Sequence, residues 1–232
     1  MKLAIMQPYF LPYIGYFQLM AAADLFVVYD NIKYTKKGWI NRNRLLLNGT
    51  DTLFSIPLSK DSDALDIRER RIAADFRRDK LLNQIAAAYR RAPCFAEVFP
   101  LAERIVNAEE SNLFVFLNQA LVHTCAHLGI DTEIRASSTI PIDHTLKGQD
   151  KVLALCAATG ATHYINPPGG VELYSREAFR DKGLELSFLR PLPLEYGQFG
   201  APFVPWLSIL DVMMFNSVER IRQDFLSHYE LF

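Results

Sequence analysis

Five cationic side chains lie in a short stretch of the chain that contains no acid between Asp30 and Asp51. Two aromatic residues, Tyr34 and Trp39, are interleaved with them. Lysine and arginine bind phosphate by charge, and arginine adds paired N–H donors. The stretch therefore predicts a site for a phosphate-bearing ligand, such as a diphosphate lipid carrier. The alternative interpretation is a solvated, positively charged loop beside a hairpin. The cations are Lys33, Lys36, Lys37, Arg42 and Arg44, and the predicted ligand-binding residues are Lys36, Lys37, Trp39, Asn41 and Arg42.

A second polar stretch, residues 137–151, runs into a predicted helix. Helix N-termini offer free N–H groups and a positive dipole end, which bind anions. We therefore predict ligand contacts from Lys147, Gln149 and Asp150, and His144 adds a titratable group that could serve as a general base. The alternative is that Thr145 simply caps the helix and the lysines are surface residues.

A third polar stretch, Asn166–Gly170, combines two prolines with two glycines at the end of a predicted strand. This pattern suits backbone contact with a ligand, with Asn166 and Gly169 as candidates, and it equally suits a structural turn.

The N-terminal stretch Gln7–Phe17 connects a short apolar run to a predicted helix. Its two prolines stiffen the loop, and Gly15 allows a backbone or a ligand to approach closely. We predict that Gln7, Tyr13 and Gly15 contact a substrate, and Tyr16 is a catalytic candidate. Asp211 is a further catalytic candidate, because a carboxylate in an apolar helix requires a polar partner.

Several common site types do not fit the sequence. His123 and His127 have the spacing of two metal ligands on a helix, but Thr124 stands where a zinc protease has glutamate, and we predict no metal site. No Ser-His-Asp elbow, Walker loop or dinucleotide glycine fingerprint is present. Three scattered cysteines suit core thiols rather than a disulfide framework.

The elements that must position these residues alternate between strands and helices. Residues 3–6 and 25–29 are predicted strands around a helix at 15–23, and strands at 132–136, 162–165 and 184–189 enclose helices at 149–159 and 175–182. This alternation predicts an α/β fold with a doubly wound, mostly parallel sheet of about five strands, Rossmann-like or nucleotidylyltransferase-like.

Between the two halves, residues 31–110 are predicted to form an inserted β-hairpin and helical subregion within a single domain, 1–232. The hairpin is centred on Asn48-Gly49, a strand is expected at 67–72, and helices at 76–91 and 95–107. A helix follows at 111–128 with Ser111 as its N-cap. After a Pro- and Gly-rich stretch at 192–203, residues 207–226 should give one or two helices.

The totals bound the class of protein. Half of the 232 residues are hydrophobic, so a large core is feasible, and the net charge of −1 gives no field that favours genomic DNA. No apolar run reaches the roughly 18 residues of a transmembrane segment, and polar residues interrupt the N-terminus too often for a signal peptide. We expect a cytoplasmic protein, with transient contact with a membrane surface left open.

Five blocks of the sequence together resemble the WbqC-like protein family, and the match runs nearly end to end. They are MQPYFLPYIGYF (Met6–Phe17), KGWINRN (Lys37–Asn43), KGQD (Lys147–Asp150), GATHYIN (Gly160–Asn166) and FVPWLSILD (Phe203–Asp211). The resemblance implies a place in bacterial O-antigen or related surface-polysaccharide biosynthesis, where some members have been suggested to be glycine transferases.

The first thirty residues also look like the start of nucleotidylyltransferase-type α/β folds. There a His-x-Gly-His signature opens the helix, whereas here Tyr13-Ile14-Gly15-Tyr16 occupies that place and only Gly15 matches. This likeness implies a nucleoside triphosphate with Mg²⁺ as a possible cofactor. An aminoacyl donor made elsewhere is equally compatible.

The sequence thus favours a transferase that places a glycyl or other aminoacyl group on a nucleotide-linked or lipid-linked sugar. The phosphorylated substrate is the partner that we predict, and the oligomeric state is left open. Two alternatives are a nucleotidylyltransferase and a non-catalytic substrate-binding subunit of the same pathway.

Overall fold

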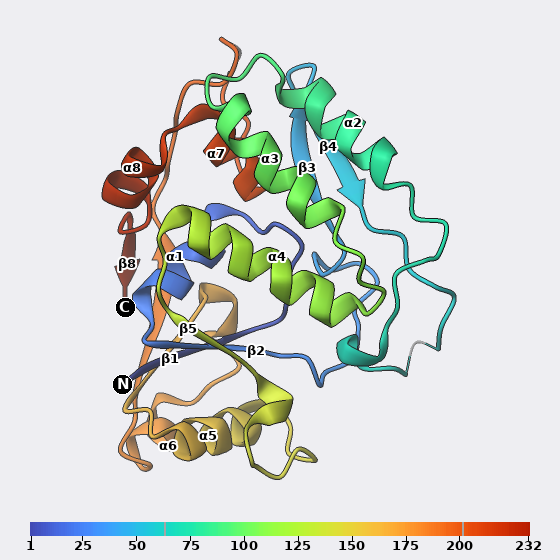
Figure 1. Cartoon of the computed structure of the whole chain (residues 1–232). Coiled ribbons are helices and arrows are strands. Elements are labelled where there is room, and N and C mark those ends of the chain that lie inside the picture. Colours follow the sequence, from blue (N-terminus) through green and yellow to red (C-terminus); the bar gives the residue numbers. More distant parts are fainter. Residues whose placement is uncertain (63, 201) are drawn as a thin grey trace.

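A mostly parallel six-stranded sheet lies at the centre of the described chain, in the order β5-β2-β1-β6-β7-β8. The structure is a computed structural model that describes residues 1–62, 64–200 and 202–232 (Figure 1). Strands β1 to β7 of this sheet pair in parallel, and β8 pairs antiparallel with β7. The strands are β1 (Lys2–Met6), β2 (Leu25–Val28), β5 (Glu133–Ala136), β6 (His163–Asn166), β7 (Glu185–Pro191) and β8 (Tyr229–Leu231).

The strand order reverses between β1 and β6, which pair with each other at the middle of the sheet. Counted in chain order, the strands read 3-2-1-4-5-6, which is the order of a doubly wound Rossmann-like sheet. The predicted α/β fold is therefore confirmed. The antiparallel edge strand β8 was not predicted, because it is only three residues long and mostly exposed, so it has no apolar run.

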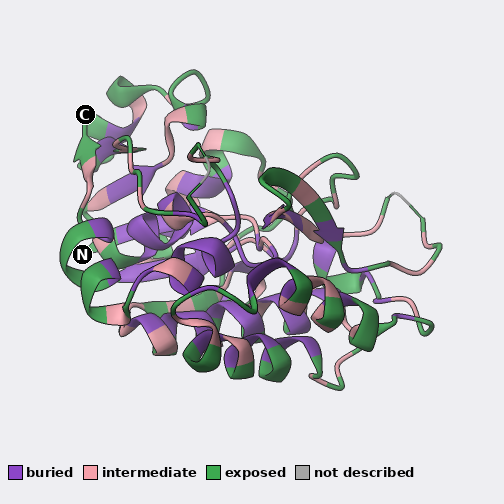
Figure 2. Cartoon of the chain, turned by 90° about the horizontal axis from the view of Figure 1, so that it is seen from above, coloured by how far each residue is buried: buried purple, intermediate pink, exposed green. Residues whose placement is uncertain are grey.

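Helices cover both faces of the sheet, and alternate residues of each strand point to opposite faces. One face packs Phe26 and Ile165 against α1, α4 and α7, and the other packs Val27 and Tyr164 against α5 and α6. Figure 2 shows that the helices are buried toward the interior and exposed on their outer sides. The helices are α1 (Ile14–Ala22), α2 (Arg78–Tyr89), α3 (Phe95–Val106), α4 (Leu113–Leu128), α5 (Gly148–Thr159), α6 (Arg176–Arg180), α7 (Ile209–Phe215) and α8 (Val218–Arg220), with a π-helix at Ile221–Phe225.

A separate antiparallel hairpin lies between β2 and α4 in the chain. It consists of β3 (Arg42–Leu47) and β4 (Thr50–Ser55). Asn48 and Gly49 both have positive φ, 52° and 77°, as the predicted Asn-Gly turn requires.

Residues 67–72 do not form the expected strand. Ile67–Glu69 is a short 3₁₀ helix, and beyond it Arg71 and Ile72 make isolated bridges. The Glu69 carboxylate accepts a hydrogen bond from the Asp66 N–H (2.8 Å), and such local side-chain bonds compete with strand pairing.

The predicted helix cap Ser111 is wrong, and the alternative in which Thr145 caps a helix does not hold either. Asn112, not Ser111, caps α4, because its Oδ1 accepts from the Val115 N–H (3.1 Å). Thr145 does not cap α5; its hydroxyl donates to Asp143 (2.7 Å), and the N-cap residue is Lys147.

Candidate functional site

The loop between β1 and α1 is held in place by two distant segments of the chain. Leu11 is buried with a φ of +44°, which is unfavourable for leucine. Its carbonyl accepts from Asn43 Nδ2 (2.9 Å) and Ser208 Oγ (2.7 Å), and the Ile209 N–H donates to the Pro12 carbonyl (2.8 Å). The loop, the β3 strand and the start of α7 therefore form one rigid assembly.

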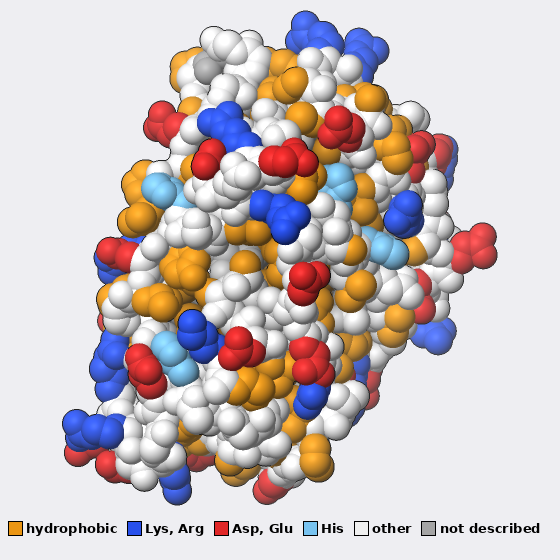
Figure 3. All heavy atoms as spheres, turned by 60° about the vertical axis from the view of Figure 1, so that its left-hand side comes forward, with side chains coloured by type: hydrophobic (Ala, Val, Ile, Leu, Met, Phe, Trp, Pro, Cys, Tyr) orange, Lys and Arg blue, Asp and Glu red, His pale blue; other side chains and the backbone are white. Residues whose placement is uncertain are grey.

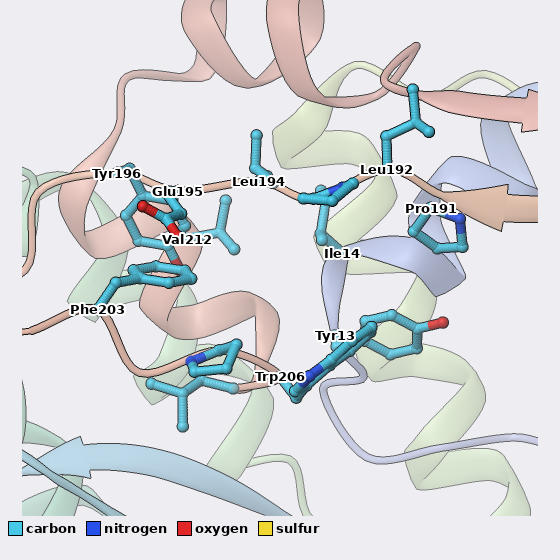
Figure 4. A pocket seen from close by; sticks show the side chains of 13 residues that line it. Tyr13, Ile14, Pro191, Leu192, Leu194, Glu195, Tyr196, Phe203, Trp206 and Val212 are labelled. Carbon is cyan, nitrogen blue, oxygen red and sulfur yellow. The ribbon is translucent and has the colours of Figure 1, made fainter.

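Two adjoining cavities lie along this assembly. The smaller, about 250 Å³, is lined by side chains from three segments. They are the loop between β1 and α1, the loop between β2 and β3 (residues 29–41, the basic loop) together with β3, and the segment before α7. The larger, about 340 Å³, lies between the start of α1, the segment after β7 and α7 (Figure 4). Tyr13 and Trp206 line both cavities, and their ring centroids are 5.7 Å apart. We refer to the two cavities together as the aromatic cleft. The smaller cavity is lined by Tyr9, Pro12, Tyr13, Trp39, Asn43, Arg44 and Trp206.

Two arginines lie over the Trp39 ring, and they differ in what else they bind. The Arg42 guanidinium donates to the carbonyls of Gly38 (3.0 Å) and Lys37 (2.7 Å), so it closes the basic loop on itself. The Arg44 guanidinium, 5.2 Å from the Trp39 ring centroid, donates to Asp51 (2.9 Å) and to the Trp206 carbonyl (3.4 Å). Arg44 Nε is buried and has no hydrogen-bond partner among the described residues.

The tryptophans of the cleft are exposed to solvent although their rings are large and apolar. Trp206 is 62 % exposed and Trp39 is 37 % exposed. Trp206 also has a φ of +61°, held beside Arg44 and Tyr13. Exposed aromatic rings around a concavity mark a binding surface rather than core.

Asp211 lies behind the larger cavity and is fully buried. Its carboxylate accepts from Tyr89 Oη (2.9 Å), Tyr196 Oη (2.7 Å) and Gln198 Nε2 (2.6 Å). Burial raises the pKa of Asp211, and the three donors oppose this shift. The Tyr196 ring lines the cavity, whereas the carboxylate does not. Asp211 therefore orients part of the wall, and its predicted catalytic role stays a prediction.

The other predicted residues of the N-terminal stretch, Gln7, Gly15 and Tyr16, do not line the cleft. The Tyr16 hydroxyl is buried and donates to the Gln7 carbonyl (2.8 Å), and burial raises its pKa. A Cβ at Gly15 would lie 2.5 Å from the Tyr13 ring, so the close approach expected at this glycine is made by that ring. Of the predicted residues of this stretch, Tyr13 is the one that lines the cleft.

The polar residues at the ends of β2 and β5 bind one another. Asp30 is buried and accepts from Ser137 Oγ (2.8 Å), from the Ser138 N–H (2.9 Å) and from the Ser138 hydroxyl. Asn31 accepts from Lys151 Nζ at its carbonyl (3.3 Å) and at Oδ1 (3.2 Å). We refer to these five residues as the strand-end cluster.

His144 is attached to the edge of the strand-end cluster. Asn31 Nδ2 donates to His144 Nδ1 (2.9 Å), so the neutral ring carries its proton on Nε2. The buried Lys151 ammonium lies 5.4 Å from the Tyr29 ring centroid, and burial lowers its pKa. His144 is exposed but does not line the aromatic cleft.

The predicted residues of α5 and of the loop after β6 lie on the α5 side of the sheet. Gln149 Oε1 accepts from the Ser175 N–H (2.6 Å), and Asn166 Oδ1 accepts from Tyr164 Oη (3.0 Å). A Cβ at Gly170 would lie 1.7 Å from Asn166 Nδ2, so Asn166 fills the space that this glycine leaves. The other three predicted residues in this region, Lys147, Asp150 and Gly169, are exposed.

The basic loop contributes fewer direct contacts to the cleft than the sequence predicts. Asn41 accepts from Tyr34 Oη (2.7 Å) and donates to the Ile56 carbonyl (2.7 Å), so its amide holds the loop to the end of β4. Lys36 and Lys37 are exposed beside Trp39.

On the face that carries α8 and β8, acidic, basic and hydrophobic side chains are intermingled (Figure 3).

Sequence reasoning missed much of the cleft wall. Trp206 lies in a block that resembles the family, and a tryptophan next to Pro205 before an apolar helix was the available signal. Arg44 is one of the five cations of the basic stretch, and no local pattern distinguishes it from the other four. The segment after β7, which includes Glu195, had no signal beyond its prolines, and residue 201 of the Pro- and Gly-rich stretch lies outside the described residues.

Two negative findings apply to the described residues. None of their helices combines the length and the apolarity that crossing a bilayer requires. No three His, Cys, Asp or Glu side chains in the same part of the chain are grouped so that they could hold a metal ion.

Two of the three comparisons with known proteins found a match. A model of the WbqC-like protein family matches residues 7–223. This range includes all the described residues that line the aromatic cleft. The chain is 30 % identical over 220 residues to a protein of Mycobacterium tuberculosis, named "Uncharacterized protein Rv1507c", and the match covers 93 % of each chain. No solved structure matches the chain. This protein therefore belongs to the WbqC-like protein family.

Proposed function

We propose that this protein is a transferase of bacterial cell-surface polysaccharide biosynthesis, including O-antigen, that moves a glycyl or other aminoacyl group onto a carrier-linked sugar. Membership of the WbqC-like family suggests the polysaccharide setting. The reaction and the substrate are our inference from the cleft. The cytoplasm is the compartment that we propose, because activated sugars and aminoacyl donors are made there.

The observation that carries this proposal is the combination of aromatic rings and an incompletely bonded arginine in the smaller cavity. Trp39, Tyr13 and Trp206 offer ring faces on which the C–H faces of a sugar can stack. The Arg44 guanidinium lines the same cavity and offers its positive charge to a phosphate oxygen beside them. A sugar linked to phosphate has both of these groups next to each other.

Aminoacyl transfer to a sugar hydroxyl or amine requires a base that removes the proton of the attacking group. Two of the predicted candidates do not face the smaller cavity, because His144 lies outside the cleft and the Asp211 carboxylate is enclosed by three donors.

The test is calorimetric binding of N-acetylglucosamine 1-phosphate, which contains the sugar–phosphate unit common to nucleotide-linked and lipid-linked sugars. The Arg44→Gln variant should bind about tenfold more weakly or worse, because a charge-assisted hydrogen bond is lost. Leu173→Ala, an exposed site outside both cavities, should bind like the wild type. Equal binding by wild type and Arg44→Gln would contradict the proposed site.

A nucleotidylyltransferase is the second candidate, and the strand order favours it. Doubly wound sheets bind nucleotides in the crevice where the strand order reverses, here between β1 and β6. Such an enzyme should release pyrophosphate from a nucleoside triphosphate and Mg²⁺ when an acceptor sugar phosphate is added. A transferase with a preformed aminoacyl donor should not.

The third candidate is a non-catalytic substrate-binding subunit, favoured because the cleft offers more binding groups than catalytic ones. It should be stabilised by the sugar phosphate in thermal unfolding but give no aminoacylated product with any donor. For the transferase, aminoacylated product should form with the correct donor, and Arg44→Gln should lower product formation together with sugar-phosphate binding.

A further inference from the structure

The larger cavity of the aromatic cleft has a lining that differs from that of the smaller one. Its wall is aliphatic or aromatic nearly throughout, from Ile14 at the start of α1 to Leu194 after β7 and Val212 in α7 (Figure 4). Glu195 is the one charged residue among the described residues that line it. At about 340 Å³ it lies within the usual size range of ligand pockets.

This lining disfavours a nucleotide in the larger cavity. A base and a ribose require several hydrogen-bond partners, and a bare apolar wall leaves their polar groups unpaired. A phosphate is disfavoured by the Glu195 carboxylate, which has the same sign of charge. A hydrocarbon chain requires only apolar contact, which this wall provides.

The two cavities adjoin, because Tyr13 and Trp206 line both of them, and this arrangement suits one amphipathic ligand. Tyr13 and Trp206 form the shared wall, with the Arg44 guanidinium on the far side donating to the Trp206 carbonyl. A ligand that places its phosphate beside Arg44 can therefore continue past these rings into the apolar cavity. The exposed Trp206 ring lies where the two parts meet.

We propose that the larger cavity binds the phosphate-proximal part of an isoprenoid chain, so that the acceptor is a sugar carried on a polyisoprenyl phosphate rather than on a nucleotide. This inference rests on the proposed function and narrows it to one carrier class. On this proposal, Leu194 and the other aliphatic residues that line the larger cavity determine the specificity for the lipid.

The experiment uses water-soluble probes on the full chain. Dimethylallyl, geranyl and farnesyl diphosphates form a series of increasing chain length, with inorganic pyrophosphate as the headgroup alone and UDP-N-acetylglucosamine as the nucleotide-linked competitor. Both tryptophans of the chain line the cleft, so intrinsic fluorescence reports binding directly, and calorimetry gives the affinity.

Affinity should rise at least tenfold from dimethylallyl to geranyl diphosphate, because each buried methylene contributes about a fourfold gain. The gain from geranyl to farnesyl should be smaller, as the chain outgrows the cavity. UDP-N-acetylglucosamine should bind more weakly than geranyl diphosphate.

Three variants locate the binding. Leu194→Asp, in the apolar wall, should remove the dependence on chain length while leaving pyrophosphate binding within about twofold of wild type. Leu194→Phe, which narrows the cavity without adding charge, should weaken farnesyl diphosphate most and serves if the aspartate variant does not fold. Leu173→Asp puts the same charge at a leucine that is 67 % exposed and outside the cleft, and it should change nothing.

The outcomes separate this inference from the function on which it rests. If affinity does not depend on chain length, or both Leu194 variants keep that dependence, the isoprenoid carrier is wrong, although Arg44-dependent binding of the sugar phosphate would still support the transferase. If geranyl diphosphate binds in a Leu194-dependent way but Arg44→Gln leaves the binding of N-acetylglucosamine 1-phosphate unchanged, the apolar site is correct and the proposed sugar-phosphate site is wrong.

Discussion

The aromatic cleft and the strand-end cluster each contain residues of a stretch in which the sequence predicts ligand contacts, yet they differ in how their hydrogen bonds are used. In the strand-end cluster, the Asp30 carboxylate and the Asn31 amide are occupied by neighbouring serines, Lys151 and His144. In the aromatic cleft, Arg44 Nε is left without a partner among the described residues, and both tryptophans are exposed.

In the strand-end cluster, polar groups bind one another and hold the fold together, whereas we propose that Arg44 of the aromatic cleft binds a ligand. Both regions contain residue types that bind phosphate, so composition does not distinguish them. The distinguishing property is the number of donors and acceptors that the protein itself already satisfies. The following predictions test this distinction, beginning with the largest expected effect.

Asp30→Ala should lower the free energy of unfolding by about 3 kcal/mol, because Ser137 Oγ and two donors of Ser138 lose a buried acceptor. Urea denaturation measures this loss, and Asp181→Ala, at an exposed site, is the matched control. Binding of N-acetylglucosamine 1-phosphate by the folded variant should stay the same. A loss below about 1 kcal/mol would show that the strand-end cluster does not stabilise the fold.

Trp39→Ala should have the opposite profile, with a large effect on binding and a small effect on stability. The ring is exposed and faces two guanidinium groups, so its removal should weaken sugar-phosphate binding about 10-fold to 100-fold. Trp39→Phe retains a ring and should recover most of the affinity in calorimetry. Equal affinities for the alanine variant and the wild type would remove Trp39 from the site.

Gly49→Ala tests whether the hairpin behind the cleft can be weakened without loss of binding. Gly49 has a φ of +77°, so alanine should cost about 1 kcal/mol although the added Cβ has open space. A Cβ at Gly169 would also have open space, and Gly169 has no positive φ. Gly169→Ala should therefore lower the free energy of unfolding little, as measured by thermal denaturation. If Gly49→Ala weakened sugar-phosphate binding more than about twofold, hairpin stability and cleft geometry would be coupled.

The smallest expected effect is a change in pH dependence at Asp211. Burial raises its pKa in the folded state, so its stabilising contribution is present below the unfolded-state pKa of about 4 and is lost as the pH rises through the folded-state pKa. The unfolding free energy of wild type minus that of Asp211→Asn should therefore fall as the pH rises from about 4 toward neutrality. The same difference for Asp181→Asn, at an exposed site, should stay flat. If the difference for Asp211→Asn rose with pH instead, the three hydrogen-bond donors would lower the pKa of Asp211 by more than burial raises it.

The sequence predicted the sheet well because short apolar runs bounded by turn residues are typical of buried strands. Strands β1 and β2, the Asn48-Gly49 turn and the crossover helices all follow from local pattern. The edge strand β8 and the 3₁₀ turn at Ile67–Glu69 do not, because one is fixed by pairing with β7 and the other by local side-chain bonds.

The candidate site was only partly predictable, because some of its contacts join residues that are far apart in the sequence. Tyr13 and Trp39 stand out locally, and both line the cleft. Trp206 reaches Tyr13 only after the chain has returned across nearly its whole length, and no local pattern encodes that contact. Likewise, nothing in the sequence shows that the Asp211 carboxylate is enclosed by Tyr89, Tyr196 and Gln198.

The strained turn at Leu11 has a consequence for how the protein is made. Its carbonyl is held by Asn43 and by Ser208, which leave the ribosome far apart in time. A nascent chain that ends before residue 208 lacks the second of these bonds and also lacks Trp206. The cleft is therefore completed only after residue 208 has been synthesised, so a shorter nascent chain presents no complete cleft.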